Sequence, residues 1–267
     1  MNICLVSTGF APEDGGGIGT YIFNLAQGLK ARGHEVFVIT PSRVASSDTE
    51  EIFEGLRVLR MRLRHVPKLE ASIPGLAWSW AVSSKIRELD RRHGIDIVEF
   101  PNWEGVGYVY ARLPGHKPVV TRVHTPYEET LMHDKKPSEI TRGDRFVCWL
   151  ERQACLLSDQ IVSSTRHHRA YMSGLYGLTE ESIRIVPLGI DIRSSDDIVK
   201  QRWQRPEPKV IKVLYVSRLE SRKGTLTFLQ AIPRIIDAHP DIEFNLIGRD
   251  RNHAPGNLTF QQYFKAA

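Results

Sequence analysis

The stretch Asp14-Gly-Gly-Gly-Ile-Gly-Thr20 lies between an apolar run at residues 3–7 and an amphipathic segment at residues 18–31. A short apolar run is typical of a buried strand, and the amphipathic segment, which Gly33 ends, is typical of a helix. Glycines let the backbone approach an anion closely, and the N–H groups at a helix start attract negative charge. The stretch therefore predicts a strand-turn-helix unit with a phosphate or similar anion at its turn.

Two common phosphate-binding loops do not fit this stretch. The P-loop ends in Lys followed by Ser or Thr, and the stretch contains no lysine. The dinucleotide fingerprint G-x-G-x-x-G/A fails from both Gly15 and Gly17, and the next strand ends in Thr40-Pro41 instead of an acid for the ribose. An NAD-dependent enzyme therefore fits poorly, and a flexible turn without a ligand remains the alternative.

The alternation of strand and helix continues along the chain. Apolar runs predict strands at residues 35–40, 56–61, 95–100, 118–123, 160–163 and 183–186, and residues 83–93 predict a helix. Strands that alternate with helices form parallel sheets, and the crossovers between them are almost always right-handed. The predicted fold class is α/β, with a doubly wound, Rossmann-like sheet.

A change of composition divides the chain. Residues 193–209 are rich in Ser, Asp, Arg and Pro, as linkers are. Beyond them, residues 211–217, 224–238 and 242–247 predict strand, helix and strand, followed by a polar tail. We therefore predict an amino-terminal domain at residues 1–190, a linker at 191–209 and the start of a second Rossmann-like domain at 210–267. Because one such unit is small for a nucleotide-binding domain, we expect this second domain to be cut short.

Composition narrows the class of protein. The 267 residues are 41% hydrophobic and 25% charged, with a net charge of +5. No run approaches the roughly 20 apolar residues of a spanning helix, and the start lacks signal-peptide features, so we expect a cytoplasmic protein. Three cysteines without metal-ligand spacing predict free thiols and no metal site. The positive charge suits an anionic partner, but no basic run with interleaved aromatics points to nucleic acid.

Five ordered motifs resemble family 4 glycosyltransferases of the GT-B fold. The opening motif combines Gly16-Gly-Ile-Gly19 with Leu29-Lys-Ala-Arg-Gly-His-Glu-Val-Phe-Val-Ile39. The four later motifs are Thr121-Arg-Val-His124, Ile161-Val-Ser-Ser164, Ile185-Val-Pro-Leu-Gly-Ile-Asp191 and Leu214-Tyr-Val-Ser-Arg-Leu-Glu-Ser-Arg-Lys-Gly224. The resemblance covers nearly the whole chain, which makes it more specific than any single glycine loop.

The resemblance implies two Rossmann-like domains that face each other across a cleft, the first for the acceptor and the second for the donor. It implies a retaining transferase without metal or cofactor, whose partners are a nucleotide sugar and a glycan or lipid-linked acceptor. By their match to the motifs, Gly16 and Gly17 would approach the donor diphosphate or sugar, and Arg218 and Lys223 would hold the diphosphate. His124 would contact the transferring sugar and is the candidate catalytic residue.

The proposed chemistry needs fixed positive charge. Breaking the bond between sugar and phosphate develops negative charge on the leaving diphosphate, which a metal-independent enzyme neutralises with cations and helix N–H groups. The planar fork of Arg218 and the point charge of Lys223 both suit phosphate oxygens. The alternatives are a solvated turn for this pair and a purely structural role for His124.

Further predictions concern an acidic residue, two tryptophans and two histidines. Glu104 follows a strand, where ligands of α/β sheets gather, and is a candidate acceptor contact; dipole complementation in a helix's first turn is the alternative. Trp78 and Trp80 suit core packing, an acceptor groove or a peripheral membrane contact. His167 and His168 are expected on the exposed start of a helix that Ser164 caps.

One part of the family pattern is missing. The resemblance implies two glutamates farther into the second domain, which contact the donor sugar and ribose, and no segment of this chain matches them. We therefore expect the 267-residue chain to be weakly active or inactive on its own. The alternative functions are a non-catalytic module that binds a sugar nucleotide or glycan, and an NAD-dependent enzyme of Rossmann type.

Overall fold

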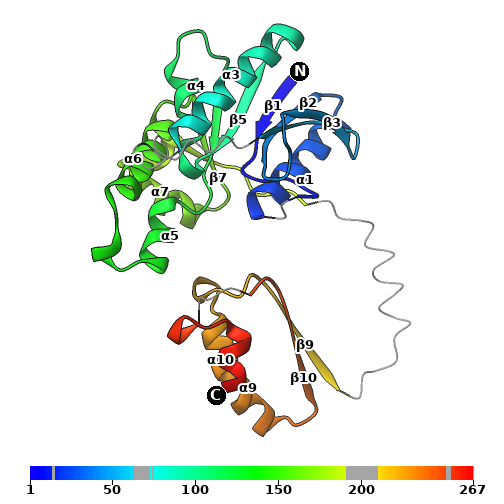
Figure 1. Ribbon diagram of the computed structural model, residues 1–267, viewed down its shortest axis with the longest axis vertical. Helices are drawn as coiled ribbons and strands as arrows, with labels where there is room; N and C mark the ends of the chain where they lie inside the picture. The colour runs from blue at the N-terminus through cyan, green and yellow to red at the C-terminus, as the bar shows by residue number, and fades with distance from the viewer. Residues whose placement is uncertain (14–15, 63–72, 74, 191–209, 251–253, 267) are drawn as a thin grey trace. The chain divides into compact units, whose positions relative to one another are not determined.

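The computed structural model describes residues 1–13, 16–62, 73, 75–190, 210–250 and 254–266. The chain divides into two compact units, Met1–Asp191 and Ile192–Ala267, and each is described by itself (Figure 1). The predicted linker at residues 191–209 lies outside the described residues, as do Asp14 and Gly15 of the glycine stretch.

The first unit is built on one eight-stranded sheet (Figure 1). Its strands are β1 (Asn2–Val6), β2 (Glu35–Ser42), β3 (Thr49–Phe53), β4 (Leu56–Arg62), β5 (Ile97–Pro101), β6 (Val119–Arg122), β7 (Gln160–Ser163) and β8 (Ile183–Ile185). The spatial order is β3-β4-β2-β1-β5-β6-β7-β8, and every pair is parallel except β3–β4. The chain winds outward from β1 in both directions, which confirms the predicted α/β class.

Helices cover both faces of this sheet. They are α1 (Gly17–Ala31), α3 (Leu76–His93), α4 (Tyr108–Arg112), α5 (Tyr127–Asp134), α6 (Arg142–Leu156) and α7 (Arg166–Tyr176), with 3-10 turns η1 (Trp103–Gly105), η2 (Pro137–Glu139) and η3 (Glu180–Ser182). Alternate residues of β1 show the two faces: Cys4 packs in the core that includes Ile86 of α3, and Leu5 packs in the core that includes Ile22 of α1. The strand must therefore be apolar throughout, as its sequence is.

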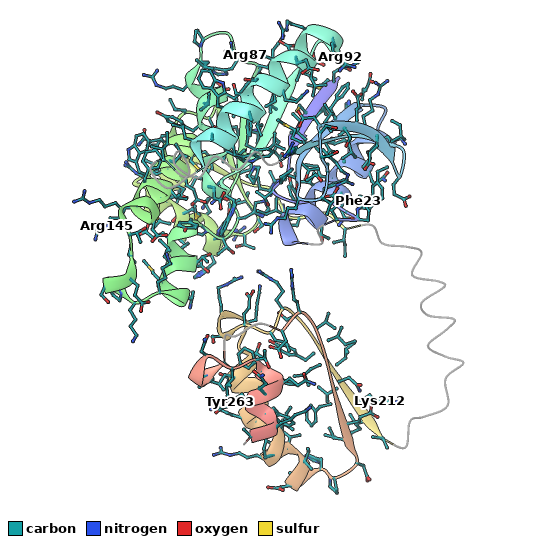
Figure 2. The ribbon with its side chains drawn as sticks, in the orientation of Figure 1. Phe23, Arg87, Arg92, Arg145, Lys212 and Tyr263 are labelled. Carbon is teal, nitrogen blue, oxygen red and sulfur yellow. The ribbon has the colours of Figure 1, made fainter. Side chains whose placement is uncertain are left out.

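Two features of the first unit differ from the sequence prediction. Helix α3 begins at Leu76, seven residues before the predicted start, and carries Trp78 and Trp80. Strand β3 was not predicted because its polar sequence, Thr49-Glu-Glu-Ile-Phe53, lies on the sheet edge and is mostly exposed. It joins β4 through a turn in which Glu54 and Gly55 both have positive φ. Figure 2 labels Arg87 and Arg92 on α3, and the Arg92 guanidinium lies 3.5 Å from the carboxylate of Glu50 on the edge strand β3.

The second unit is smaller. Parallel strands β9 (Ile211–Val216) and β10 (Ile242–Ile247) pack with α9 (Thr225–Ala238), and two 3-10 turns, η4 (Ser221–Lys223) and η5 (Pro255–Asn257), precede α9 and the last helix. The predicted polar tail is wrong in its second half, where α10 (Phe260–Ala266) forms. Its Phe260 is 1% exposed, and the Asp250 carboxylate accepts hydrogen bonds from the N–H groups of Phe260 and Gln261.

Within the described parts of both units, no helix has the length and apolar character that crossing a membrane requires.

Candidate functional site

Helix α1 begins at the glycine stretch. Gly16 is the N-cap residue with extended backbone, and Gly17 is the first helical residue. A Cβ on Gly17 would meet no atom within 4 Å, whereas a Cβ on Gly19 would overlap the carbonyl oxygen of Gly9. The glycines therefore serve two purposes: Gly19 permits close packing, and Gly16 and Gly17 are exposed at the helix start. The sequence prediction missed this division, because spacing alone does not show which glycine meets the preceding loop.

His124 lies directly after the end of β6. Its N–H donates to Asn102 Oδ1 at 2.8 Å, and its ring meets the Tyr21 ring edge-on at a centroid distance of 5.4 Å. Tyr21 lies one turn into α1, so the structure brings His124 beside the helix that Gly17 begins. Burial, reinforced by the nearby Arg122 and His168, lowers the pKa of His124 to about 4. The imidazole is therefore neutral at neutral pH.

A pocket of about 310 Å³ adjoins His124. It is lined by Val123, His124, Thr125, Ser164, His168 and Leu188. The Nε2 atom of His124 is buried and has no hydrogen-bond partner among the described residues. A neutral imidazole with one uncommitted nitrogen can exchange a hydrogen bond with a hydroxyl group that enters the pocket.

The predicted surroundings of this pocket need a correction. The cap of α7 is Thr165, whose Oγ1 accepts the N–H of His168 at 3.1 Å, so Ser164 is not the cap. His167 is exposed as predicted, but His168 is half-buried and its Nδ1 lies 2.9 Å from Ser163 Oγ. The prediction of two exposed histidines failed because the second one turns back toward the end of β7.

A buried polar cluster that the sequence prediction missed supports His124. The Tyr21 hydroxyl donates to Glu99 Oε1 at 2.6 Å, and Arg122 Nε lies 3.7 Å from the same oxygen. The Arg122 guanidinium also stands 4.6 Å from the Tyr21 ring centroid and donates to Val186 O at 2.8 Å. Burial raises the pKa of Glu99, and Tyr21 and Arg122 oppose that shift. An arginine at the end of a buried strand, two residues before His124, was the available signal.

A larger cavity of about 1040 Å³ lies beside α3, α5 and α6. Its wall includes Trp78, Trp80, Trp103, Glu104 and Tyr127. Trp78 packs partly against the core, whereas Trp80 is 62% exposed, so core packing explains only the first. Aromatic rings next to a carboxyl group form a wall that can contact both the apolar and the hydroxyl parts of a polyol.

Glu104 lies in this wall with unusual backbone geometry. Its φ of 54° places it in the left-handed region within η1, so it is not an ordinary first-turn acid of a helix. Burial raises the pKa of Glu104, while Trp103 and the positive charge of Arg43 lower it. A carboxyl group in such a wall can accept a hydrogen bond from a hydroxyl group.

The basic pair belongs to the second unit. Arg218 and Lys223 both lie in the loop between β9 and α9, and Arg218 Nη1 is 3.0 Å from Glu220 Oε1. Arg222 approaches the same carboxylate at 3.7 Å. Gly224, with φ of 73°, is the N-cap residue of α9. The structure thus places the pair in one loop at the start of a helix, the arrangement that the glycine stretch has in the first unit.

The described side chains include no group of three or more histidine, cysteine or acidic residues that could hold a metal ion.

Comparison with known proteins gives three kinds of likeness. Residues 15–194 match the sequence model of Glycosyltransferase Family 4. A glycogen synthase of Mycobacterium tuberculosis is 27% identical over 93% of this chain and 61% of its own length, and a D-inositol 3-phosphate glycosyltransferase of Thermomonospora curvata is 25% identical over 88% and 57%. The chain thus spans about three-fifths of the length of these relatives.

Solved structures show the same fold. Sucrose-phosphate synthase from Thermosynechococcus elongatus superimposes with a TM-score of 0.67 at 18% identity, over 92% of this chain and 62% of that one. A trehalose-6-phosphate structure from E. coli bound with UDP-2-fluoro glucose gives 0.60 at 15% identity, over 100% and 68%.

Proposed function

This chain belongs to glycosyltransferase family 4 and has a GT-B type of fold. From that membership we propose that it acts in retaining hexosyl transfer. The reaction moves a hexose from a nucleotide-diphosphate sugar to a glycan or lipid-linked acceptor. The names of the relatives, a glycogen synthase and an inositol phosphate glycosyltransferase, support sugar transfer to a hydroxyl group. The UDP-2-fluoro glucose held by the E. coli structure supports a nucleotide-sugar donor.

One observation carries the proposal: the neutral His124 lies beside the helix that Gly16 and Gly17 begin. Tyr21 of that helix contacts the His124 ring, and the lining of the pocket next to the ring includes hydroxyl and imidazole groups beside two apolar side chains. We assign His124 a hydrogen bond to a hydroxyl of the transferring sugar. The exposed glycines at the start of α1 let the backbone N–H groups approach the donor.

The second unit supplies positive charge in the proposed reaction. Arg218 and Lys223 neutralise the charge that develops on the leaving diphosphate, so the reaction needs no metal or other cofactor. Arg218 is 55% exposed at its side chain and pairs with Glu220, so a diphosphate would compete with that carboxylate for the guanidinium. The proposed domain roles follow: residues 1–190 hold the acceptor, and residues 210–267 contribute to donor binding.

The larger cavity is the proposed acceptor site. Glu104 contacts an acceptor hydroxyl there, and Trp103 and Tyr127 offer ring faces and edges to a sugar or polyol. The exposed Trp80 and the net charge of +5 support a peripheral contact with an anionic membrane surface on the cytoplasmic side, which a lipid-linked acceptor would require.

Donor binding and nucleotide release test this function. The chain is titrated with UDP-, GDP- and ADP-hexoses by calorimetry, and nucleotide release is followed with and without a glycan acceptor. We expect one of these donors to bind. His124→Ala should lower the donor affinity or the rate of nucleotide release about tenfold, the value of one lost hydrogen bond. His167→Ala, which changes an exposed neighbouring histidine, is the matched control. Co-purified NAD without binding of any nucleotide sugar would contradict the proposal.

A further inference from the structure

Helix α6 carries two buried acids seven residues apart, Asp144 and Glu151. They are 6% and 1% exposed, and a separation of two helical turns places both on one side of the helix. Figure 2 shows that the neighbouring Arg145 projects outward from α6, whereas the two acids lie among its buried residues. Two buried carboxylates are costly unless each is satisfied by donors.

Glu151 accepts three hydrogen bonds. Its Oε1 accepts the N–H of Glu104 at 2.9 Å, and its Oε2 accepts the N–H of Tyr127 at 2.9 Å and the hydroxyl of Tyr176 at 3.2 Å. Glu104 lies in the loop after β5, and Tyr127 begins the helix that follows β6. One carboxylate therefore joins two loops. The first carries Glu104, the proposed acceptor contact, and the second carries His124, three residues before Tyr127.

The loop that contains Glu104 is pressed against α6. A Cβ on Gly105 would lie 2.7 Å from atoms of Leu150, and a Cβ on Gly75 would lie 2.8 Å from the Glu104 carbonyl oxygen. The left-handed backbone of Glu104 is unfavourable for a residue with a side chain. Its hydrogen bond to Glu151 offsets that cost and holds the Glu104 side chain in the cavity wall.

Tyr127 is held at both ends by the same helix. Its N–H donates to Glu151, and its hydroxyl donates to Asp144 Oδ1 at 2.9 Å. Asp144 also pairs with Lys135 at 2.8 Å and accepts the hydroxyl of Thr141. The fixed Tyr127 ring then meets the Trp103 ring edge-on at 5.6 Å. Three neighbouring residues of the cavity wall thus depend on contacts with α6.

We propose that Glu151 is a positioning residue that sets the acceptor wall by holding the main-chain N–H groups of Glu104 and Tyr127. The proposal rests on the proposed function for the identity of the cavity as an acceptor site. The hydrogen bonds of Glu151 are independent of that function. Glu151 touches neither substrate nor reacting atoms in this role. Its effect on the reaction is on acceptor binding, because the residues that it holds line the larger cavity and not the His124 pocket.

Hydrogen exchange tests the positioning without any need for activity. In the wild-type chain, the Glu104 and Tyr127 amides should exchange about 100-fold more slowly than the amide of Glu181, which lies in an exposed turn. Above about pH 8 the wild-type Glu151 side chain is ionised and accepts all three hydrogen bonds. In Glu151→Gln, one oxygen becomes an N–H donor that faces a donor, and we expect exchange at one or both amides to speed up about tenfold at that pH. Asp144→Asn is the matched control, since it changes the contact with the Tyr127 hydroxyl but leaves Glu104 exchange unchanged.

Kinetics separate positioning from a merely structural role. With UDP-glucose as donor and maltotetraose or D-inositol 3-phosphate as acceptor probe, we expect Glu151→Gln to raise the acceptor KM about tenfold while the donor KM changes less than about twofold. Unprotected amides in the wild type, unchanged exchange in the variant, or an equal rise of both KM values would overturn the proposal. Failure of every variant to bind a nucleotide sugar would instead count against the proposed function. Absence of transfer alone is expected of this chain and leaves the exchange result to decide the positioning.

Discussion

The loops at the starts of α1 and α9 occupy equivalent places in the two units, yet they are built in opposite ways. In the first unit, the loop is rich in glycine and its strand, β1, is buried on both faces. In the second, the loop carries Arg218, Arg222 and Lys223, and its strand, β9, is largely exposed. Leu214 and Val216 of β9 are 60% and 68% exposed.

This difference separates two ways of preparing a site for an anionic ligand. The first unit relies on backbone N–H groups and on polar side chains buried around His124, which rigid packing must hold in place. The second relies on exposed cations, which cost little to maintain and are screened by salt. Substitutions near His124 should therefore change stability, and substitutions near Arg218 should change binding alone.

The largest expected effect is that of Arg122→Ala. Arg122 is 4% exposed and stands beside the buried Glu99, so its removal leaves an acid without its cationic neighbour. We expect a loss of about 3 kcal/mol in the free energy of unfolding, measured by urea denaturation. Arg218→Ala, the corresponding change in the second unit, should cost less than about 0.5 kcal/mol. Equal losses in the two variants would remove the contrast between the units.

The second effect is a dependence of stability on pH. Burial raises the pKa of Glu151 to about 8, against an ordinary value of 4.5, although its three donors oppose the shift. Between these values the folded chain binds more protons than the unfolded chain, so stability falls as the pH rises through this window. We expect the wild type to lose about 2 kcal/mol relative to Glu151→Gln between about pH 5.5 and pH 7.5.

The neighbours of Glu151 do not cancel this slope. Glu104, Cys148, Cys155 and Tyr176 are acidic groups that interact with it, and burial raises the pKa of each. Glu104 therefore adds to the loss of unfolding free energy in the wild type. Because Glu104 is also present in Glu151→Gln, its contribution largely cancels in the difference between the two proteins. Urea midpoints that run parallel for the two proteins across this pH range would show that Glu151 is ionised throughout.

Much of this fold follows from local pattern. The strands β7 and β10 begin and end at their predicted residues, because a short apolar segment in each is flanked by polar residues that mark its ends. Strand β3 and helix α10 could not be found in this way. Both are polar or short, and each is fixed by tertiary partners: β3 by its pairing with β4, and α10 by Phe260 in the core and by Asp250.

The site was predictable only where motifs carry it. His124, Arg218, Lys223 and the exposed glycines stand in recognisable segments, and their roles remain proposals. The residues that position the site do not lie in recognisable segments. Glu99 comes from a strand and Glu151 from a helix far along the chain. Their importance arises from contacts across 47 residues for Glu104–Glu151 and 78 residues for Tyr21–Glu99. A single sequence contains no local signal for such pairs.

A pair of glycine substitutions tests the division of labour at the start of α1. Gly19→Ala would place a methyl group against the Gly9 carbonyl, whereas Gly17→Ala would place one in open space. We expect the first to cost about 1–2 kcal/mol of unfolding free energy through overpacking. The second should leave stability within about 0.5 kcal/mol and weaken donor binding, because its methyl group stands where a phosphate would approach. Unfolding in urea and calorimetric titration measure the two effects.

The smallest effect is expected in the basic loop of the second unit. Arg218→Ala and Lys223→Ala should each weaken binding of UDP-glucose about fivefold, or about 1 kcal/mol, because each removes one cation near the diphosphate. Arg234→Ala, which removes an exposed cation from α9, is the control and should leave binding unchanged. The losses should shrink as salt rises, since exposed charges are screened, whereas the loss caused by Gly17→Ala should persist. The loss in the arginine and lysine variants could instead be independent of salt. The exposed loop would then be as enclosed in the bound state as the His124 pocket. The contrast between the units would in that case hold only for the free protein.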